Sequence, residues 1–506
     1  MMVLDIYFAV VKPGAHNDDG AAIFAATVTA AVCGLVIIAK VARRWWGSPK
    51  TFHEHFVRYL GKEYQKLQTH DKEFPGYDLA SVHRALASIL GEDCSEVREV
   101  GGGFWEDLRE MFRDVNVPFS GRRSPSTPRY ERVPVDVDAE ESLAANQLWL
   151  VTLKKRFEIK ASDTTEPVGE RVAILLSARH VPNPYADEME GERVPTNVLA
   201  LSVACRDRAI ADWFYREIEA RRKKLSVYRG KLIDPFVGTG GITSIGFRAI
   251  KRVQEEDLVL PEEVKALLRG AVVEFYRHKD QLRAVGVEMK RGVLLCGPPG
   301  TGKTSISLYL AGLLPEFTIC FVSGRQLLYP RELCRMARYL QPTMIVFEDI
   351  DLIAEQRDTN GLATVLGELM NQIDGCEPDE EVLFVMNTNS LERLEVAVRN
   401  RPGRVDQIVQ IPLPDARSRE QLIRYFARNV KLAEAEDELE GVIRMTDGAT
   451  PATLKEIVKR ATVGAVERMD GQVGNIELRQ ADLVLAVKQV DAMRENARTR
   501  VTGFAG

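Results

Sequence analysis

The stretch "GVLLCGPPGTGKTSISLYLAG", residues 292–312, decides the fold of this 506-residue chain. Residues 293–296 are an apolar run typical of a short buried strand, and residues 297–304, "GPPGTGKT", fit the pattern G-x-x-x-x-G-K-[ST]. The apolar spacing that follows predicts a helix. In such a unit the glycines let backbone N–H groups surround phosphates, and the helix N-terminus adds positive potential. We therefore expect an α/β fold with a phosphate-binding loop.

Two residues of this loop have individual expected roles. Lys303 is expected to reach the β- and γ-phosphates of a nucleotide, and Thr304 is expected to ligate Mg²⁺. The residues expected to bind the nucleotide are Gly297, Pro298, Pro299, Gly300, Thr301, Gly302, Lys303, Thr304 and Ser305.

A second apolar run, in "PTMIVFEDID" (342–351), ends in acids. A P-loop nucleotide hydrolase needs an acid on a neighbouring strand to hold Mg²⁺, and a second polar group to orient the attacking water. By position, Glu348 is expected to face the metal and Asp349 the water. The alternative is a strand that simply ends in solvated acids.

Two later stretches supply further candidates for catalysis. "EVLFVMNTNS" (381–390) predicts another buried strand, and Asn389 at its end is expected to contact the attacking water or the γ-phosphate. In "NRPGRVDQIVQIPLPD" (400–415), Arg401 and Arg404 flank a Pro-Gly turn. An arginine aimed at a γ-phosphate is worth about 10³-fold or more in rate. Two solvent-exposed arginines are the alternative.

From about residue 258 to 470 the chain resembles an AAA-family ATPase module. "GPPGTGKT" matches the Walker A motif, "IVFEDID" matches Walker B, Asn389 matches sensor 1, and "RPGRVD" matches the second region of homology. The resemblance implies ATP and Mg²⁺ as cofactors and a homo-oligomeric ring of six or seven subunits, in which Arg401 and Arg404 act on the ATP of the adjacent subunit. "MTDGATPATLKEIVKRA" (445–461) resembles the family's small helical lid, with Ala452 at the second sensor position.

The order Glu348-Asp349 departs from the family's usual Asp-Glu. It resembles the Bcs-type AAA proteins, membrane-anchored translocases with an N-terminal span, a middle domain and a C-terminal AAA module. Between Walker A and Walker B, "SGRQLLYPRELCRMARYLQP" (323–342) is shorter than in protein-threading rings. Tyr329 is its only aromatic residue in the expected pore position, and packing at a helix start fits Tyr329 equally well. Hydrolysis is still expected, with modest turnover, because near-attack placement tolerates little error.

A membrane segment is expected near the N-terminus. Between Asp19 and Lys40 twenty residues carry no charge, which at 1.5 Å per residue is about 30 Å, the thickness of the hydrocarbon core. Arg43, Arg44 and two tryptophans follow, which favours a span with the N-terminus outside and the ATPase module on the cytoplasmic or an equivalent side. A buried globular helix is the alternative.

The expected architecture is a P-loop AAA module, a parallel αβα sandwich with a helical lid, preceded by a mixed α/β middle domain and one transmembrane helix. "IDPFVGTGGITSIG" (233–246) lacks the lysine of a phosphate loop and favours a hairpin or loop. The expected segments are an N-terminal tail (1–20), the span (21–41), a helical region (48–116), a linker (117–130), the middle domain (131–257), the large ATPase subdomain (258–414), and the lid with the C-terminal tail (415–506).

Composition narrows the functions further. A net charge of −5 gives no basic footprint, so no nucleic-acid partner is expected. Seven cysteines without a C-x-x-C motif suggest a reducing compartment, and no H-E-x-x-H motif of a zinc peptidase occurs. The expected function is a membrane-anchored ATPase that remodels or translocates an unidentified protein. The alternative is a slow ATP-dependent switch or scaffold at a membrane.

Overall fold

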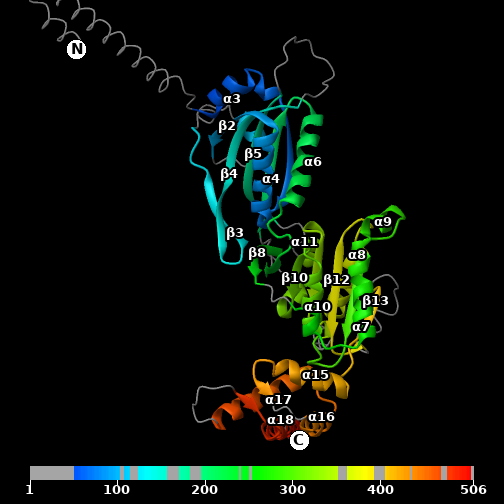
Figure 1. Ribbon diagram of the computed structural model, residues 1–506. Helices are drawn as coiled ribbons and strands as arrows, with labels where there is room; N and C mark the ends of the chain where they lie inside the picture. The colour runs from blue at the N-terminus through cyan, green and yellow to red at the C-terminus, as the bar shows by residue number, and fades with distance from the viewer. Residues whose placement is uncertain are drawn as a thin grey trace, which may run out of the picture.

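A computed structural model describes three parts that follow one another along the chain (Figure 1). They are a middle domain, an ATPase part and a C-terminal lid. The described residues are 51–102, 108–113, 124–155, 170–182, 195–238, 241–249, 253–351, 362–391, 405–432, 436–468 and 476–502. The expected membrane span at 21–41 lies outside these ranges. Within them, no helix has the length and apolar character needed to cross a membrane.

The middle domain is an antiparallel sheet covered by helices on both faces. Its strand order is β1-β6-β5-β4-β2, and β3 also pairs with β4. Alternate residues of the strands enter two separate cores, one shared with α4 and α6 and the other with α3 and α5. The strands are β1 (Gln68–Pro75), β2 (Cys94–Gly101), β3 (Arg129–Asp136), β4 (Ala139–Leu153), β5 (Arg171–Pro182) and β6 (Pro195–Cys205). The helices are α3 (Phe52–Leu60), α4 (Leu79–Glu92), α5 (Leu108–Arg113) and α6 (Arg208–Lys224), with η1 (Tyr64–Lys66) and η2 (Gly76–Asp78).

The expectation of an all-helical region at 48–116 is wrong in part, because β1 and β2 lie within it. Strand β1 pairs only with β6 and reads "QTHDKEFP", in which Phe74 is the only buried residue. Such an edge strand has no apolar alternation to reveal it. The apolar runs at 148–153, 172–177 and 198–205 lie within β4, β5 and β6.

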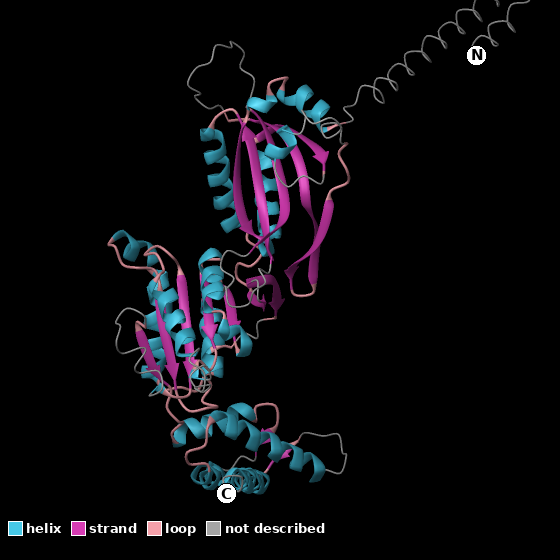
Figure 2. Cartoon of the chain, turned by 180° about the vertical axis from the view of Figure 1, so that it is seen from behind, coloured by secondary structure: helices cyan, strands magenta, loops and turns pink. Residues whose placement is uncertain are grey.

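The ATPase part is a sheet in the order β13-β9-β12-β11-β10-β7-β8. All neighbouring strands from β13 to β7 run parallel. One face packs against α7, η6, α8 and α10, and the other against α11 and α13, so both faces are buried. Figure 2 shows this sheet flanked by helices. The strands are β7 (Leu232–Gly238), β8 (Gly241–Arg248), β9 (Arg291–Cys296), β10 (Thr318–Val322), β11 (Thr343–Phe347), β12 (Val382–Thr388) and β13 (Gln407–Gln410). The helices are α7 (Glu262–Leu268), the π-helix η6 (Arg269–Glu274), α8 (Phe275–Arg277), α9 (Lys279–Ala284), α10 (Lys303–Leu313), η7 (Gly324–Leu328), α11 (Pro330–Tyr339) and α13 (Leu362–Asp374).

The glycine-rich stretch at 233–246 forms the β7–β8 hairpin, so the hairpin prediction is confirmed. Its place differs from the predicted boundary at residue 257. Strand β7 pairs in parallel with β10, so the hairpin extends the ATPase sheet rather than the sheet of the middle domain.

The lid is a small helical domain with its own core. Tyr425 of the lid donates a hydrogen bond to Asp257 at 2.6 Å, and Tyr309 of α10 donates one to Glu255 at 3.2 Å. The short helix η5 (Glu255–Asp257) therefore links the lid to the ATPase part. The lid elements are α15 (Ala416–Phe426), α16 (Glu436–Met445), α17 (Pro451–Arg468), α18 (Gln480–Thr502), and the paired β14 (Lys431–Leu432) and β15 (Glu477–Leu478).

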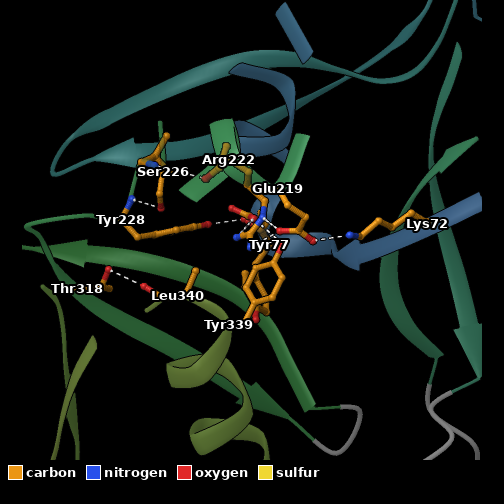
Figure 3. A network of polar contacts seen from close by, with 12 residues as sticks. Lys72, Tyr77, Glu219, Arg222, Ser226, Tyr228, Thr318, Tyr339 and Leu340 are labelled. Atoms are coloured by element: carbon orange, nitrogen blue, oxygen red, sulfur yellow. Dashed lines mark hydrogen bonds and ion pairs between the residues drawn. The ribbon is translucent and has the colours of Figure 1, made fainter. Parts of the chain in front are cut away.

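A buried polar network joins the middle domain to the ATPase part (Figure 3). Arg222 at the end of α6 pairs with Asp78 at 3.2 Å and with Glu219 at 2.8 Å. Tyr339, the last residue of α11, donates a hydrogen bond to Asp78 at 2.7 Å, and its ring lies under the Arg222 guanidinium at 4.1 Å. Asp78 is fully buried and the Arg222 side chain is 4% exposed. The charged pair belongs to the middle domain, and Tyr339 of the ATPase part contacts both of its members.

Arg222→Ala is predicted to lower the free energy of unfolding by about 3 kcal/mol, the usual scale for removing one partner of a buried pair. Burial raises the pKa of Asp78, and Arg222 opposes that shift, so without Arg222 the carboxyl takes up a proton and the loss stays near this value. Tyr339→Phe should cost about 1 kcal/mol, one hydrogen bond.

Urea unfolding followed by tryptophan fluorescence measures both effects, since Trp149 and Trp213 lie in the core of the middle domain. Lys66→Ala is the control, because Lys66 pairs with Glu63 on an exposed surface. An Arg222→Ala midpoint equal to that of this control would contradict the prediction.

Candidate nucleotide-binding site

The phosphate loop joins β9 to α10, and its glycines are required by its shape. Gly300 and Gly302 have φ of +81° and +99°, the left-handed region that residues with a Cβ avoid. A Cβ at Gly297 would lie 2.5 Å from the backbone oxygen of Ile411. The loop therefore takes the strand–loop–helix form predicted from the sequence, with the N-terminus of α10 at its end.

Lys303, the first residue of α10, lies between the loop and the strand ends. Its amine donates to the backbone oxygens of Gly297 at 2.8 Å and Pro298 at 3.2 Å, and to Asn389 Oδ1 at 2.8 Å. Burial lowers the pKa of Lys303, while the carboxylates of Asp349 and its neighbours oppose this shift. The amine is thus held at the loop by acceptors that a phosphate oxygen can replace.

The acids follow β11 directly, as predicted. Thr304 Oγ1 donates to Glu348 Oε2 at 3.0 Å, so the hydroxyl and the carboxylate expected to serve Mg²⁺ lie in contact. Burial raises the pKa of Glu348, and the nearby polar side chains of Asn387 and Thr304 oppose this shift. Asp349 has φ of 49°, a left-handed conformation that is uncommon outside glycine. The strand therefore ends in a sharp turn at the acid expected to face the water.

Asn389 connects the parts of the site. Its side-chain oxygen accepts from Lys303, and its amide nitrogen donates to Asp349 Oδ1 at 3.2 Å and to Asp351 Oδ2 at 3.3 Å. Its backbone N–H donates to Asp351 Oδ1 at 3.0 Å. Asp351 is 5% exposed and holds Asn389 in place, although the sequence analysis assigned it no role. The three acids in "EDID" were the signal that could have indicated it.

The oxygens at Glu348 and Thr304 fit Mg²⁺. Glu348 Oε1 is buried and accepts no hydrogen bond from the part of the chain that the structure describes. A buried carboxylate oxygen without a donor suits a cation, and hard oxygen ligands are those Mg²⁺ prefers. No group of three or more His, Cys, Asp or Glu side chains among the described residues could hold a metal. That agrees with Mg²⁺ sites that use one or two protein oxygens together with phosphates.

The lid reaches the phosphate loop at Ala452. The Ala452 N–H donates to the backbone oxygen of Gly300 at 3.1 Å. A Cβ at Gly300 would lie 2.9 Å from the Ala452 Cβ, which is closer than two carbons approach. A small residue at 452 and a glycine at 300 therefore let the lid lie against the loop.

The other predicted residues differ in where they lie. Arg401 and Arg404 lie outside the described residues. Thr304 and Ser305 are exposed at the start of α10, and Thr301 is buried, with its hydroxyl donating to the Pro298 oxygen at 2.9 Å. Tyr329 is half-buried between η7 and α11, which leaves its pore role a prediction.

The fold and this site define a P-loop nucleotide-binding protein. Residues 293–413 match the family model described as "ATPase family associated with various cellular activities (AAA)". Residues 293–413 are therefore similar to AAA-family ATPase modules.

Part of the chain is similar in sequence to known proteins. Proteasome-activating nucleotidase of Aeropyrum pernix is 32% identical over 248 residues, 46% of this chain and 58% of that protein. ATP-dependent zinc metalloprotease FtsH 4 of Sphaerobacter thermophilus is 32% identical over 270 residues, 50% of this chain and 40% of that protein. A crystal structure of the FIGL-1 AAA domain matches 49% of this chain and 89% of that chain at 24% identity, with a TM-score of 0.39. The chain thus spans about half the length of the curated relatives it matches.

Gly300→Ala is predicted to weaken ATP binding by about 10-fold or more, because it adds left-handed strain of about 1–2 kcal/mol and presses on the lid at Ala452. Titration with a fluorescent ATP analogue measures this effect. Gly464→Ala is the matched control: Gly464 lies in α17 of the lid with open space where a Cβ would be. That change should stabilise the helix by about 0.5–1 kcal/mol and leave affinity unchanged. Equal affinities for the two variants would argue against lid–loop contact in the bound state.

Proposed function

We propose that this chain binds Mg-ATP at the phosphate loop and hydrolyses it to ADP and phosphate. The observation that carries the proposal is the continuous chain of contacts from Lys303 through Asn389 to Asp349, with Thr304 and Glu348 in contact beside it. Hydrolysis needs a phosphate-binding cation, a metal-binding acid and a water-orienting acid within one site. The residues that we propose for these roles are Lys303, Glu348 and Asp349. Lys303 is the first residue of α10, and the two acids directly follow β11.

Each residue has a distinct role in this proposal. Lys303 binds the β- and γ-phosphates, and Thr304 and Glu348 hold Mg²⁺, which when bound neutralises phosphate charge. Asp349 orients the attacking water and accepts its proton. Asn389 contacts the water or the γ-phosphate and keeps Asp349 in position. Asp351 fixes Asn389 through its side chain and backbone.

We further propose that the site is completed in a homo-oligomeric ring by Arg401 and Arg404 of an adjacent subunit. The support is the match of "RPGRVD" to the second region of homology and the position of that segment immediately before β13. Six or seven subunits are the sizes that the resemblance implies.

The proposed biological role is that of a membrane-anchored motor that remodels or translocates a protein. The uncharged stretch within 20–39 and its basic flank support the anchor, and the Glu-Asp order supports a Bcs-type layout. A slow ATP-dependent switch or scaffold is the second candidate. It is favoured by the half-buried place of Tyr329 at a helix start, since a pore residue needs exposure.

Asp349→Asn is predicted to keep ATP binding and reduce turnover by at least about 100-fold, because general-base catalysis contributes roughly 10²–10⁴-fold. Lys303→Ala is predicted to lose tight ATP binding itself. Phosphate release and analogue titration on the detergent-solubilised protein separate the two effects. Normal turnover in Asp349→Asn would assign the base to Glu348 instead.

Arg404→Ala and Arg401→Ala are predicted to bind ATP normally and to lose turnover by about 10³-fold. In the parent protein, turnover per chain should rise with protein concentration as rings assemble. Turnover that is independent of concentration and unaffected by either substitution would rule out a shared site and favour the switch.

A further inference from the structure

An arginine of the last helix lies at the start of α17, where the lid meets the phosphate loop, and the proposed mechanism gives it no role. Arg494 lies on α18, which packs against α17 in the lid (Figure 1). Its guanidinium donates a hydrogen bond to Thr453 Oγ1, in the first turn of α17. Thr453 is 9% exposed, and its hydroxyl shares a second hydrogen bond with Thr450 Oγ1 at 3.0 Å. A cation from α18 is therefore connected, through two hydroxyls, to the residue that precedes α17.

The first three residues of α17 leave one backbone N–H for a partner outside the lid. N–H groups at the start of a helix have no acceptor within the helix. Pro451 has no N–H, and the Thr453 N–H goes to Thr450 Oγ1 at 3.3 Å. The remaining N–H is that of Ala452, which donates to the backbone oxygen of Gly300 in the phosphate loop at 3.1 Å. The orientation of this turn therefore decides whether the lid bonds to the loop.

The turn lies close to the loop, so a small rotation would break the contact. A Cβ at Gly300 would lie 2.9 Å from the Ala452 Cβ and 3.0 Å from Thr450 Oγ1. The two threonines belong to the turn or adjoin it, so they cannot fix it relative to the rest of the lid. Arg494 bonds to the turn from another helix, and a charged donor makes a stronger hydrogen bond than a neutral one. Arg494 therefore ties the turn to the body of the lid.

We propose that Arg494, acting through Thr453, is a positioning residue that keeps the first turn of α17 on the phosphate loop and thereby slows the release of nucleotide. The inference rests on the proposed Mg-ATP site and adds to it the way in which the lid is held against the loop. The effect falls on release, because differences in affinity at one binding surface arise mostly in the dissociation rate.

The test is the dissociation rate of a fluorescent ADP analogue from the full, detergent-solubilised chain, followed after a chase with unlabelled ADP. Removing a hydrogen bond to a charged group changes an equilibrium by at least about 10-fold when the group is buried. Because Arg494 is exposed, Arg494→Ala is expected to raise the dissociation rate by about 5-fold and to leave the association rate within about 2-fold. Arg494→Lys keeps a charged donor and should restore the parent dissociation rate to within about 2-fold.

Arg468→Ala is the matched control, because the exposed Arg468 joins the same two helices at the opposite end of α17. It pairs with Asp482 of α18 and donates to the Glu477 backbone oxygen at 3.1 Å. Its loss should loosen the lid to a similar degree and change the dissociation rate by less than about 2-fold. Equal dissociation rates for Arg494→Ala and Arg468→Ala would show a merely structural role and would overturn the proposal.

Thr453→Val removes the hydroxyl through which Arg494 acts and keeps a side chain of similar shape. It should raise the dissociation rate by about 5-fold, and it decides the question if Arg494→Ala does not fold. Adding Arg494→Ala to Thr453→Val should change the rate by less than about 2-fold, because the two residues act through one bond. Effects that multiply to about 25-fold would show two independent causes and would also overturn the proposal.

Two outcomes separate this inference from the proposed function. If the parent protein does not bind the analogue, the proposed nucleotide site is wrong and this inference is wrong with it. If the parent binds the analogue, and both Arg494→Ala and Thr453→Val release it at the parent rate, only the positioning role is wrong.

Discussion

The parallel pairing of β12 between β9 and β11 is the constraint on which the site depends. In a parallel sheet the carboxyl ends of neighbouring strands meet at one edge, where ligands of open α/β folds bind. The phosphate loop leaves β9 at Cys296, the acids leave β11 at Phe347, and Asn389 follows the end of β12. One misregistered strand would turn these side chains to the other face of the sheet. All seven residues of β12 are buried and the first five are apolar, which makes that register costly to change.

The same strand β11 connects the site to the middle domain. Helix α11 ends at Tyr339, which bonds to Asp78, and β11 begins at Thr343 and ends immediately before Glu348. A movement of the middle domain away from α11 would keep the Asp78–Arg222 pair but lose the Tyr339 hydrogen bond to Asp78 and the contact of its ring with Arg222. The segment from Tyr339 to Phe347 therefore runs directly from the interface with the middle domain to the acids of the candidate site.

Local motifs could be predicted from the sequence, and features that depend on strand pairing could not. The phosphate loop, the acids after β11 and Asn389 follow from residue spacing, because each is a short strand with its own loop. The strands β1 and β2 were missed, since a polar edge strand carries no apolar pattern. The hairpin β7–β8 was recognised, but its membership of the ATPase sheet depends on pairing with β10, which no local pattern encodes. Asp351 acquires its contacts with Asn389 only when β11 and β12 are neighbours.

The reversed order of the two acids is matched by two different local features. The longer Glu348 accepts a hydrogen bond from the Thr304 hydroxyl at 3.0 Å. The shorter Asp349 is compensated by the backbone, because its left-handed conformation turns the carboxylate toward the Asn389 amide at 3.2 Å. Such a conformation costs about 1–2 kcal/mol and persists only where neighbouring bonds determine it. The Ile350 N–H bond to the Asn387 oxygen is one of these, so β12 helps to hold the turn in which Asp349 lies.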